Sequence, residues 1–196
     1  MLFRSGAAAL PRRAAEIASY FFWQGYRMQE SFVRAAVPPA VRAAAEQAGI
    51  GEPTPMAAVT GLTSELVQDA LARFHAANPQ LPAIDVTLDN GYVRKVLSGP
   101  PTSLVAFARA LAAARGAESE AFARGRLGRR PIEFAWEFVA ASAPFHSRYM
   151  EHGRRALPDD LAREGIAFDP RGLGLPVLSN DGSDLRACTE IGRAHV

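Results

Sequence analysis

The order of apolar patterns between residues 56 and 141 constrains the fold of this chain most. Short strand-like runs are interleaved with two segments whose apolar residues recur every three or four positions, which is the helical period. The expected elements are, in chain order, a strand over Met56–Thr60, a helix after the N-cap Thr63, strands over Ile84–Leu88 and Tyr92–Ser98 joined by the turn Asp89-Asn90-Gly91, a helix from a cap at Thr102 or Ser103 through Ala114, and an extended run over Ile132–Ala141. This order predicts a ferredoxin-like βαββαβ subdomain within an α/β fold.

Helical patterns flank this region on both sides. The expected flanking elements are a helix over residues 12–36 that Pro38-Pro39 stops, a short helix over residues 41–48, a turn at Pro144–Ser147, a helix over Leu157–Glu164 opened by Pro158-Asp159-Asp160, a buried strand over Gly172–Leu178 and a loop over Ser179–Ser183. We therefore expect three parts: residues 6–55 and 142–189 belong to one larger body, and residues 56–141 form the subdomain.

Composition excludes several classes of protein. With 48% hydrophobic and 21% charged residues, the chain is expected to fold into a globular body. No apolar run approaches the roughly 20 residues that a membrane-spanning helix needs, so no membrane partner is expected. The one cysteine, Cys188, excludes an internal disulfide framework and a cysteine-based zinc site, and we expect no metal and a cytoplasmic location.

The positive charge does not indicate nucleic-acid binding. The formal net charge is only +2, and Lys95 is the sole lysine among 22 basic residues. The arginines are scattered, apart from a cluster between Arg124 and Arg130, and no basic stripe with interleaved aromatic residues is present. The cluster is interpreted as a solvated loop, and no nucleic-acid partner is expected.

The two ends of the chain do not fit the rest of the pattern. Residues 1–5 and 190–196 back-translate into sequences that resemble the adapters used in short-read sequencing. We therefore interpret both segments as translated adapter and give His195 and Arg193 no functional role. Within this chain, the natural sequence is expected to span about Gly6 to Thr189, and the natural protein is expected to continue beyond both of these positions.

Three segments together resemble a known enzyme family. Val96-Leu-Ser-Gly-Pro-Pro-Thr-Ser-Leu104, Ala143-Pro-Phe-His-Ser147 and Asn180-Asp-Gly-Ser-Asp-Leu-Arg186 resemble, in order and spacing, the acyltransferase domain of type I fatty acid synthase, of the fungal β-subunit and actinobacterial type. The resemblance implies a partial α/β-hydrolase-like acyltransferase core with an inserted ferredoxin-like subdomain. It also implies transfer of an acyl group from coenzyme A to the phosphopantetheine arm of acyl carrier protein, with no bound cofactor and with other synthase domains as partners.

The resemblance places the catalytic histidine at His146. An imidazole suits this role, because it can take a proton from a nucleophile in one half-reaction and return it in the other near neutral pH. The motifs give no such role to His75 and His152. The family's nucleophile is a serine in a Gly-His-Ser-x-Gly elbow, and no Gly-x-Ser-x-Gly occurs in this sequence. We expect the elbow to lie upstream of Gly6 and the chain as given to be inactive.

One helix bears on the choice of acyl group. Malonyl-transferring relatives carry an arginine directly before a glycine in the segment that resembles Trp23–Glu30, and that arginine grips the substrate carboxylate. Gln24 stands at this position, and an amide offsets a full negative charge poorly. Acetyl-CoA is therefore the expected substrate, although Arg27, three residues on, is a candidate substitute. Asn90 aligns with a polar turn and is a further candidate binding residue, while its simpler interpretation is a hairpin turn.

Other functions remain open from the sequence. Within enzymes, the alternatives are a malonyl/palmitoyl transferase domain of the same type of megasynthase and a polyketide loading domain. A different class is a non-catalytic ferredoxin-like scaffold formed by residues 56–141. The aromatic residues Tyr20, Phe21 and Trp23 are interpreted as core, although they could line an acyl tunnel.

Overall fold

The computed structural model describes residues 10–32 and 37–167. The chain divides into two compact units, Met1–Ser31 with Glu151–Val196 and Phe32–Met150. The unit boundaries fall next to Phe32 and Met150, whereas the sequence suggested boundaries at residues 55/56 and 141/142. Among the described helices, none is long and apolar enough to cross a membrane. The predicted segments at Gly172–Leu178, Ser179–Ser183 and Asn180–Arg186, and Cys188, lie outside the described residues.

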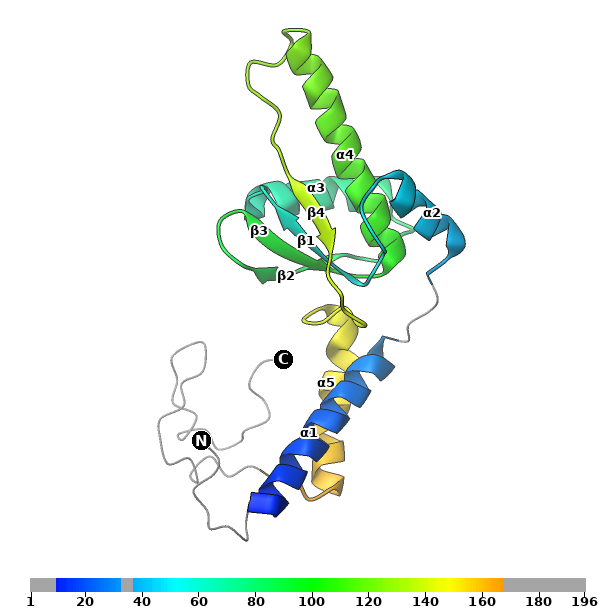
Figure 1. Ribbon diagram of the computed structural model, residues 1–196, viewed down its shortest axis with the longest axis vertical. Helices are drawn as coiled ribbons and strands as arrows, with labels where there is room; N and C mark the ends of the chain where they lie inside the picture. The colour runs from blue at the N-terminus through cyan, green and yellow to red at the C-terminus, as the bar shows by residue number, and fades with distance from the viewer. Residues whose placement is uncertain (1–9, 33–36, 168–196) are drawn as a thin grey trace. The chain divides into compact units, whose positions relative to one another are not determined.

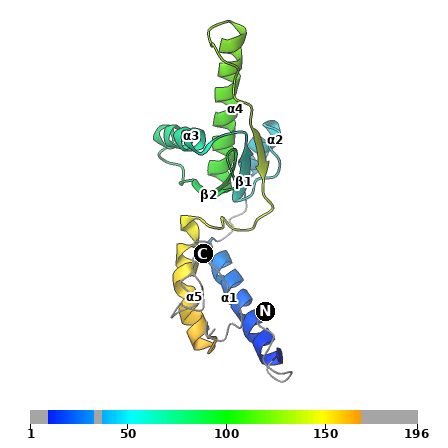
Figure 2. The ribbon, with the colours of Figure 1, turned by 90° about the vertical axis from the view of Figure 1, so that its left-hand side faces the viewer.

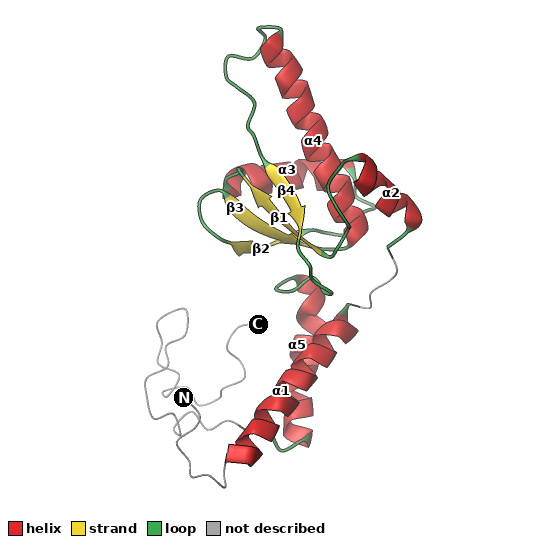
Figure 3. Ribbon diagram, in the orientation of Figure 1, coloured by secondary structure: helices red, strands yellow, loops and turns green. Residues whose placement is uncertain are grey.

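The second unit contains a four-stranded antiparallel sheet (Figure 1, Figure 3). Its elements are, in chain order, α2 (Pro39–Gln47), β1 (Met56–Thr60), α3 (Ser64–Ala77), β2 (Asp85–Asp89), β3 (Arg94–Ser98), α4 (Pro101–Ala123), β4 (Ala135–Phe138) and the 3-10 turn η1 (Arg148–Met150). The strand order is β2-β3-β1-β4, with every neighbouring pair antiparallel. The order of strands and helices predicted for residues 56–141 is therefore confirmed.

Two helices close the apolar core of this unit. Val59 of β1 and Leu97 of β3 are fully buried and pack with α3 and α4. Phe74 of α3 and Phe107 of α4 meet edge to face, with ring centroids 5.3 Å apart. Because side chains alternate across a strand, Ser98, next to Leu97, points to the opposite face of the sheet. The sheet therefore has one face under α3 and α4 and another on which polar side chains can be presented.

Helix α4 is longer than its apolar pattern predicts. It runs to Ala123, nine residues past the predicted end at Ala114, because the residues from Ala117 to Ala123 include several strong helix formers. The predicted cap at Thr102 or Ser103 is wrong: the helix begins at Pro101 after Pro100, and the Ser103 hydroxyl donates to the Pro82 carbonyl at 2.8 Å. The exposed C-terminal half of α4 projects beyond the sheet (Figure 2).

The first unit contains two packed helices, α1 (Leu10–Ser31) and α5 (Glu151–Arg163). They approach closely at Gly153, where an added Cβ would lie 2.5 Å from the Arg27 carbonyl oxygen. The Gly153 N–H donates to the Ser31 hydroxyl at 2.6 Å, and that hydroxyl donates to the Arg27 carbonyl at 2.7 Å. A glycine is therefore required where the two helices meet.

Two predicted boundaries of these helices are wrong. Helix α1 ends at Ser31, short of residue 36, and Phe32 packs its ring edge to face with that of Tyr149. Helix α5 begins at Glu151 and contains Pro158, which does not open it. The proline is tolerated because it lies on the exposed side, where solvent can reach the carbonyl that its missing N–H leaves unpaired. The interpretation of Phe21 as core is also wrong, since its side chain is 62% exposed.

Candidate active site

His146 lies in a tight turn between β4 and η1. Ala143–Ser147, which we call the histidine turn, is closed by the Phe145 N–H donating to the Ala143 carbonyl at 2.9 Å and by the Ser147 hydroxyl donating to the Pro144 carbonyl at 2.5 Å. His146 has φ of 60°, and no other described non-glycine residue has a positive φ. An L-residue in the left-handed region carries strain that the surrounding contacts must hold, and such residues cluster at functional sites.

Ser98 fixes the chain immediately before the histidine. Its side chain is fully buried, and its hydroxyl donates to the Phe145 carbonyl at 3.1 Å. The same hydroxyl lies 2.9 Å from that of Thr87, whose oxygen is within 3.2 Å of the Val96 carbonyl. Ser98 belongs to the segment Val96–Leu104, so two of the three segments that carry the family resemblance are in direct contact.

Asp85 fixes the chain immediately after the histidine turn. Its carboxylate accepts from the Arg148 backbone N–H at 2.9 Å and from the Arg148 guanidinium, whose pKa it raises through these hydrogen bonds. The Tyr149 hydroxyl donates to the Ala83 carbonyl at 2.7 Å, and burial raises the pKa of that hydroxyl. Asp85 and Ser98 are paired across β2 and β3, so one rung of the sheet holds both sides of the turn.

This arrangement presents an imidazole on a fixed backbone. The His146 side chain is exposed, and within residues 10–32 and 37–167 it makes no hydrogen bond or ion pair. A neutral imidazole has one donor and one acceptor nitrogen, and both are available to a reacting group here. The geometry therefore suits a general base and acid whose position is set through its main chain.

Asn90 is not brought to this site. It lies in the loop at the other end of the β2–β3 hairpin, where its N–H donates to the Arg94 carbonyl at 2.9 Å. Along β2, four residue steps separate Asp85, which pairs with Ser98, from Asp89, which pairs with Lys95; this is about 13 Å of strand. The structure thus places Asn90 and His146 at opposite ends of β2 and β3.

The hairpin loop is organised by the only lysine. Lys95 is 1% exposed, and its ammonium group donates to the Asp89 carboxylate at 2.7 Å and to the Gly91 and Tyr92 carbonyls. The hydrogen bond from Lys95 to the Asp89 carboxylate lowers the pKa of Asp89, with a further contribution from the Ser64 hydroxyl. Because the loop curls around the ammonium group, β3 begins at Arg94, and the predicted start at Tyr92 is wrong.

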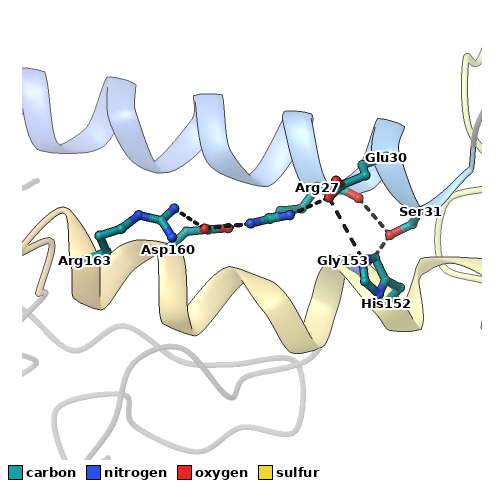
Figure 4. A network of polar contacts seen from close by, with 7 residues as sticks. All are labelled: Arg27, Glu30, Ser31, His152, Gly153, Asp160 and Arg163. Carbon is teal, nitrogen blue, oxygen red and sulfur yellow. Dashed lines mark hydrogen bonds and ion pairs between the residues drawn. The ribbon is translucent and has the colours of Figure 1, made fainter.

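Gln24 and Arg27 lie one turn apart on α1. Gln24 is half-buried and makes no hydrogen bond within the described residues. The Arg27 guanidinium is occupied: it donates to the Asp160 carboxylate through Nε at 2.5 Å and Nη2 at 2.8 Å, and to Glu30 through Nη1 (Figure 4). Arg163 donates to the same Asp160 carboxylate (Figure 4).

The charge pair of Arg27 and Asp160 is strong. Asp160 is completely buried, yet hydrogen bonds from Arg27 first and then from Arg163 lower its pKa to about 2. The Arg27 pKa is raised in turn, mainly by its hydrogen bonds to Asp160 and Glu30. Both groups are therefore ionised over the whole physiological range. We call the contacts among Arg27, Ser31, Gly153 and Asp160 the α1–α5 joint.

The other two histidines in the described part of the chain have structural or solvent-facing positions. His75 Nε2 accepts from the Ile84 N–H at 3.3 Å, just before β2 begins. His152 is exposed on α5, 4.0 Å from a Glu30 carboxylate oxygen. No group of three or more His, Cys, Asp or Glu residues that could hold a metal ion is found in the described part of the chain.

Sequence reasoning missed Ser98, Asp85 and Asp160. Ser98 and Asp85 act through contacts with residues 47 and 63 positions away, which local periodicity does not register. Asp160 did leave a signal: Gly153, Leu157 and Asp160 share one face of a helix, and the first two are apolar. A carboxylate on an apolar helix face needs a buried partner, and Arg27 supplies it.

Comparisons with known proteins show the family to which the chain belongs. The family model described as "Starter unit:ACP transacylase in aflatoxin biosynthesis" matches residues 6–122, more than half of the chain. The fatty acid synthase β subunit of Saccharomyces cerevisiae is 29% identical over 84% of this chain, and that of Schizosaccharomyces pombe is 32% identical over 92%. The chain spans about 8% of the length of each of these relatives.

A solved malonyl CoA-acyl carrier protein transacylase from Clostridium perfringens is 17% identical and overlaps 76% of this chain and 34% of its own. Its TM-score of 0.46 is too low to establish a common fold. The family assignment therefore depends on the sequence match over residues 6–122. This chain belongs to the family of starter unit:ACP transacylase domains found in fatty acid synthase β subunits.

Proposed function

We propose that this chain is part of an acyltransferase domain that moves an acetyl starter group from acetyl-CoA to acyl carrier protein through an acyl-serine intermediate. The observation that carries the proposal is His146: an exposed imidazole on a left-handed residue, held on one side by Ser98 and on the other by Asp85. Strain at a solvent-facing histidine has no evident structural benefit, and it is typical of a catalytic position.

In the proposed reaction His146 moves one proton in each direction. It takes the proton of the serine hydroxyl while the serine oxygen attacks the thioester carbonyl, and it gives that proton to the departing coenzyme A thiolate. In the second half-reaction it takes the proton of the carrier's pantetheine thiol, whose sulfur attacks the serine ester. The proton then returns to the serine oxygen as the ester bond breaks.

The acyl group is proposed to be neutral. Gln24 offers an amide where malonyl-transferring relatives offer a guanidinium, and the nearest cation on the same helix, Arg27, is already paired with Asp160. A malonyl carboxylate would therefore lose its hydration without gaining a full opposite charge. Acetyl-CoA acts as a substrate and no cofactor is bound. We assign Asn90 no contact with the reacting atoms, because it lies at the far end of the hairpin from His146.

The wider architecture is part of the same proposal. The sheet of residues 56–141 is proposed to be a ferredoxin-like subdomain inserted into a larger α/β-hydrolase-like core to which residues 6–55 and 142–189 belong. The nucleophilic serine is proposed to lie in an elbow upstream of Gly6. The partners are the phosphopantetheine arm of acyl carrier protein and other domains of a cytoplasmic fatty acid synthase.

Two assays test the proposal. The reading frame that contains this chain, expressed in full, is expected to transfer labelled acetyl from acetyl-CoA to a carrier protein and to discriminate against malonyl-CoA. The 196-residue chain alone is expected to form no acyl-enzyme with labelled acetyl-CoA. Preferred malonyl or palmitoyl transfer would favour the other transferase functions, and no transfer of any acyl group would favour a non-catalytic scaffold. A stoichiometric adduct on the chain alone would contradict the missing nucleophile.

A further inference from the structure

The α1–α5 joint contains a paired and mostly buried cation: the Arg27 side chain is 19% exposed. Asp160 has a 1% exposed side chain and engages Arg27 with both carboxylate oxygens, at 2.5 and 2.8 Å (Figure 4). Two parallel hydrogen bonds between a guanidinium and a carboxylate are the strongest form of such a pair. The Arg27 guanidinium is 6.0 Å from the ring centroid of Trp23 and 5.6 Å from that of Tyr26, which further limits where it can move.

Arg27 is within reach of Gln24, the position that is proposed to decide which acyl group is bound. Side chains three residues apart on a helix are neighbours, with Cβ atoms about 5–6 Å apart, so the Arg27 guanidinium could approach a group bound at Gln24. The Gln24 amide has no hydrogen-bond partner in the described part of the chain, so its donors and acceptor are available. The charge of Arg27 is thus adjacent to Gln24 but committed to Asp160.

We propose that Asp160 is a specificity-determining residue: by holding Arg27 it removes the one α1 cation that could bind a substrate carboxylate beside Gln24. The inference rests on the proposed acyl transfer and adds to it a reason for acetyl selectivity beyond the identity of residue 24. Asp160 does not touch the acyl group; it acts through Arg27. Without Asp160, Arg27 would keep only its contact with Glu30 through Nη1, and α1 would present Gln24 together with a guanidinium whose Nε and Nη2 donors are open to a malonyl carboxylate.

Three other cations of this unit are also paired, and one of them, Arg163, donates to Asp160 itself and lies 5.1 Å from the ring centroid of Trp23. Arg154 and Arg155 both bind Glu151 at the start of α5, and their hydrogen bonds lower its pKa to about 2. Glu151 and Asp160 are therefore two carboxylates of the same helix that both bind two arginines, and of the two only Asp160 binds Arg27. This difference provides a matched control.

The test compares acyl selectivity in the complete protein. Asp160→Asn, which keeps the side-chain shape, is expected to raise the ratio of malonyl to acetyl transfer, measured as kcat/KM, by about tenfold, the size expected for one charge-assisted contact. Glu151→Gln is expected to leave the ratio unchanged. Both substrates are assayed on one preparation, so the ratio does not depend on the fraction of active enzyme. The double variant Asp160→Asn/Arg27→Gln must return the ratio to that of the wild type.

A second measurement leaves the joint intact, in case Asp160→Asn does not fold. Gln24→Glu places a carboxylate on the protein where the substrate carboxylate would lie. If Asp160 holds Arg27, the introduced carboxyl is expected to titrate by NMR near the ordinary glutamate value of about 4.3. A pKa lowered by a full unit would mean that Arg27 is free to pair with it and would overturn the inference.

The outcomes separate the two proposals. If the wild type transfers acetyl and Asp160→Asn gains no malonyl transfer, or gains it without dependence on Arg27, Asp160 does not control selectivity and the proposed function stands. If the wild type transfers no acetyl at all, the proposed function itself fails, whatever the Gln24→Glu titration gives.

Discussion

Replacing His146 by glycine and by alanine tests the strained backbone at the centre of the site. Both substitutions remove the imidazole, so they differ in how well the new residue accepts a φ of 60° and in how much freedom it has in the unfolded chain. A left-handed conformation costs an L-residue about 1–2 kcal/mol that glycine does not bear. Glycine loses about 0.5–1 kcal/mol more than alanine through its larger freedom in the unfolded chain. The His146→Gly variant should therefore be more stable than His146→Ala by up to about 1.5 kcal/mol.

His152 provides the matched control, because it is also exposed but lies in the regular helix α5. There glycine should be less stable than alanine by about 1 kcal/mol, so the sign reverses between the two histidines. Thermal unfolding followed by circular dichroism resolves this, since 1 kcal/mol shifts the Tm of a chain of this size by about 2–4 °C. If alanine is the more stable substitution at both positions, the argument that tertiary contacts hold His146 in a strained conformation is wrong.

Three further predictions concern single contacts within one or the other unit. Gly153→Ala should destabilise the chain by about 1 kcal/mol in urea unfolding, because the clash with the Arg27 carbonyl outweighs the gain in helix propensity. Gly25→Ala should stabilise it by about 0.5–1 kcal/mol, because a Cβ added at Gly25 meets nothing within 4 Å. The pKa of Asp160 is lowered from about 3.9 in the unfolded chain to about 2 in the folded one. Its contribution to stability should therefore be complete above about pH 4 and should decline as the pH falls toward 2. Urea midpoints measured over this pH range would refute this if those of Asp160→Asn fall as steeply as those of the wild type. Ser98→Ala should cost about 1 kcal/mol by removing the donor to the Phe145 carbonyl, and an unchanged urea midpoint would show that this hydrogen bond does not stabilise the turn.

The sequence predicted the sheet unit well because each of its elements carries a local signal. Thr63 caps α3 by accepting from the Leu66 N–H at 3.4 Å, and Met56–Thr60 forms β1 over the predicted residues. The errors arose where a distant contact overrides the local pattern. Lys95 draws the hairpin loop around its ammonium group, and the Ser103 hydroxyl bonds to Pro82 in place of capping α4.

The candidate site could be predicted only in part. His146 came from a resemblance between motifs, and nothing local predicts its left-handed backbone or its anchors on Asp85 and Ser98. Gln24 and Arg27 were both identified from one helix, but which charges are free depends on Asp160, 133 residues further along the chain. Pairing of this kind is decided by packing and lies beyond the reach of periodicity.

The most direct test of the account is the initial rate of acetyl transfer from acetyl-CoA to acyl carrier protein in the full reading frame, measured for the wild type, His146→Ala and His152→Ala. Loss of a general base lowers a rate by typically 10²–10⁴-fold, and we expect His146→Ala to fall by about that factor while His152→Ala stays within twofold or so of the wild type. A His146→Ala protein that is folded and transfers acetyl at the wild-type rate would contradict the assignment of His146 as the catalytic residue.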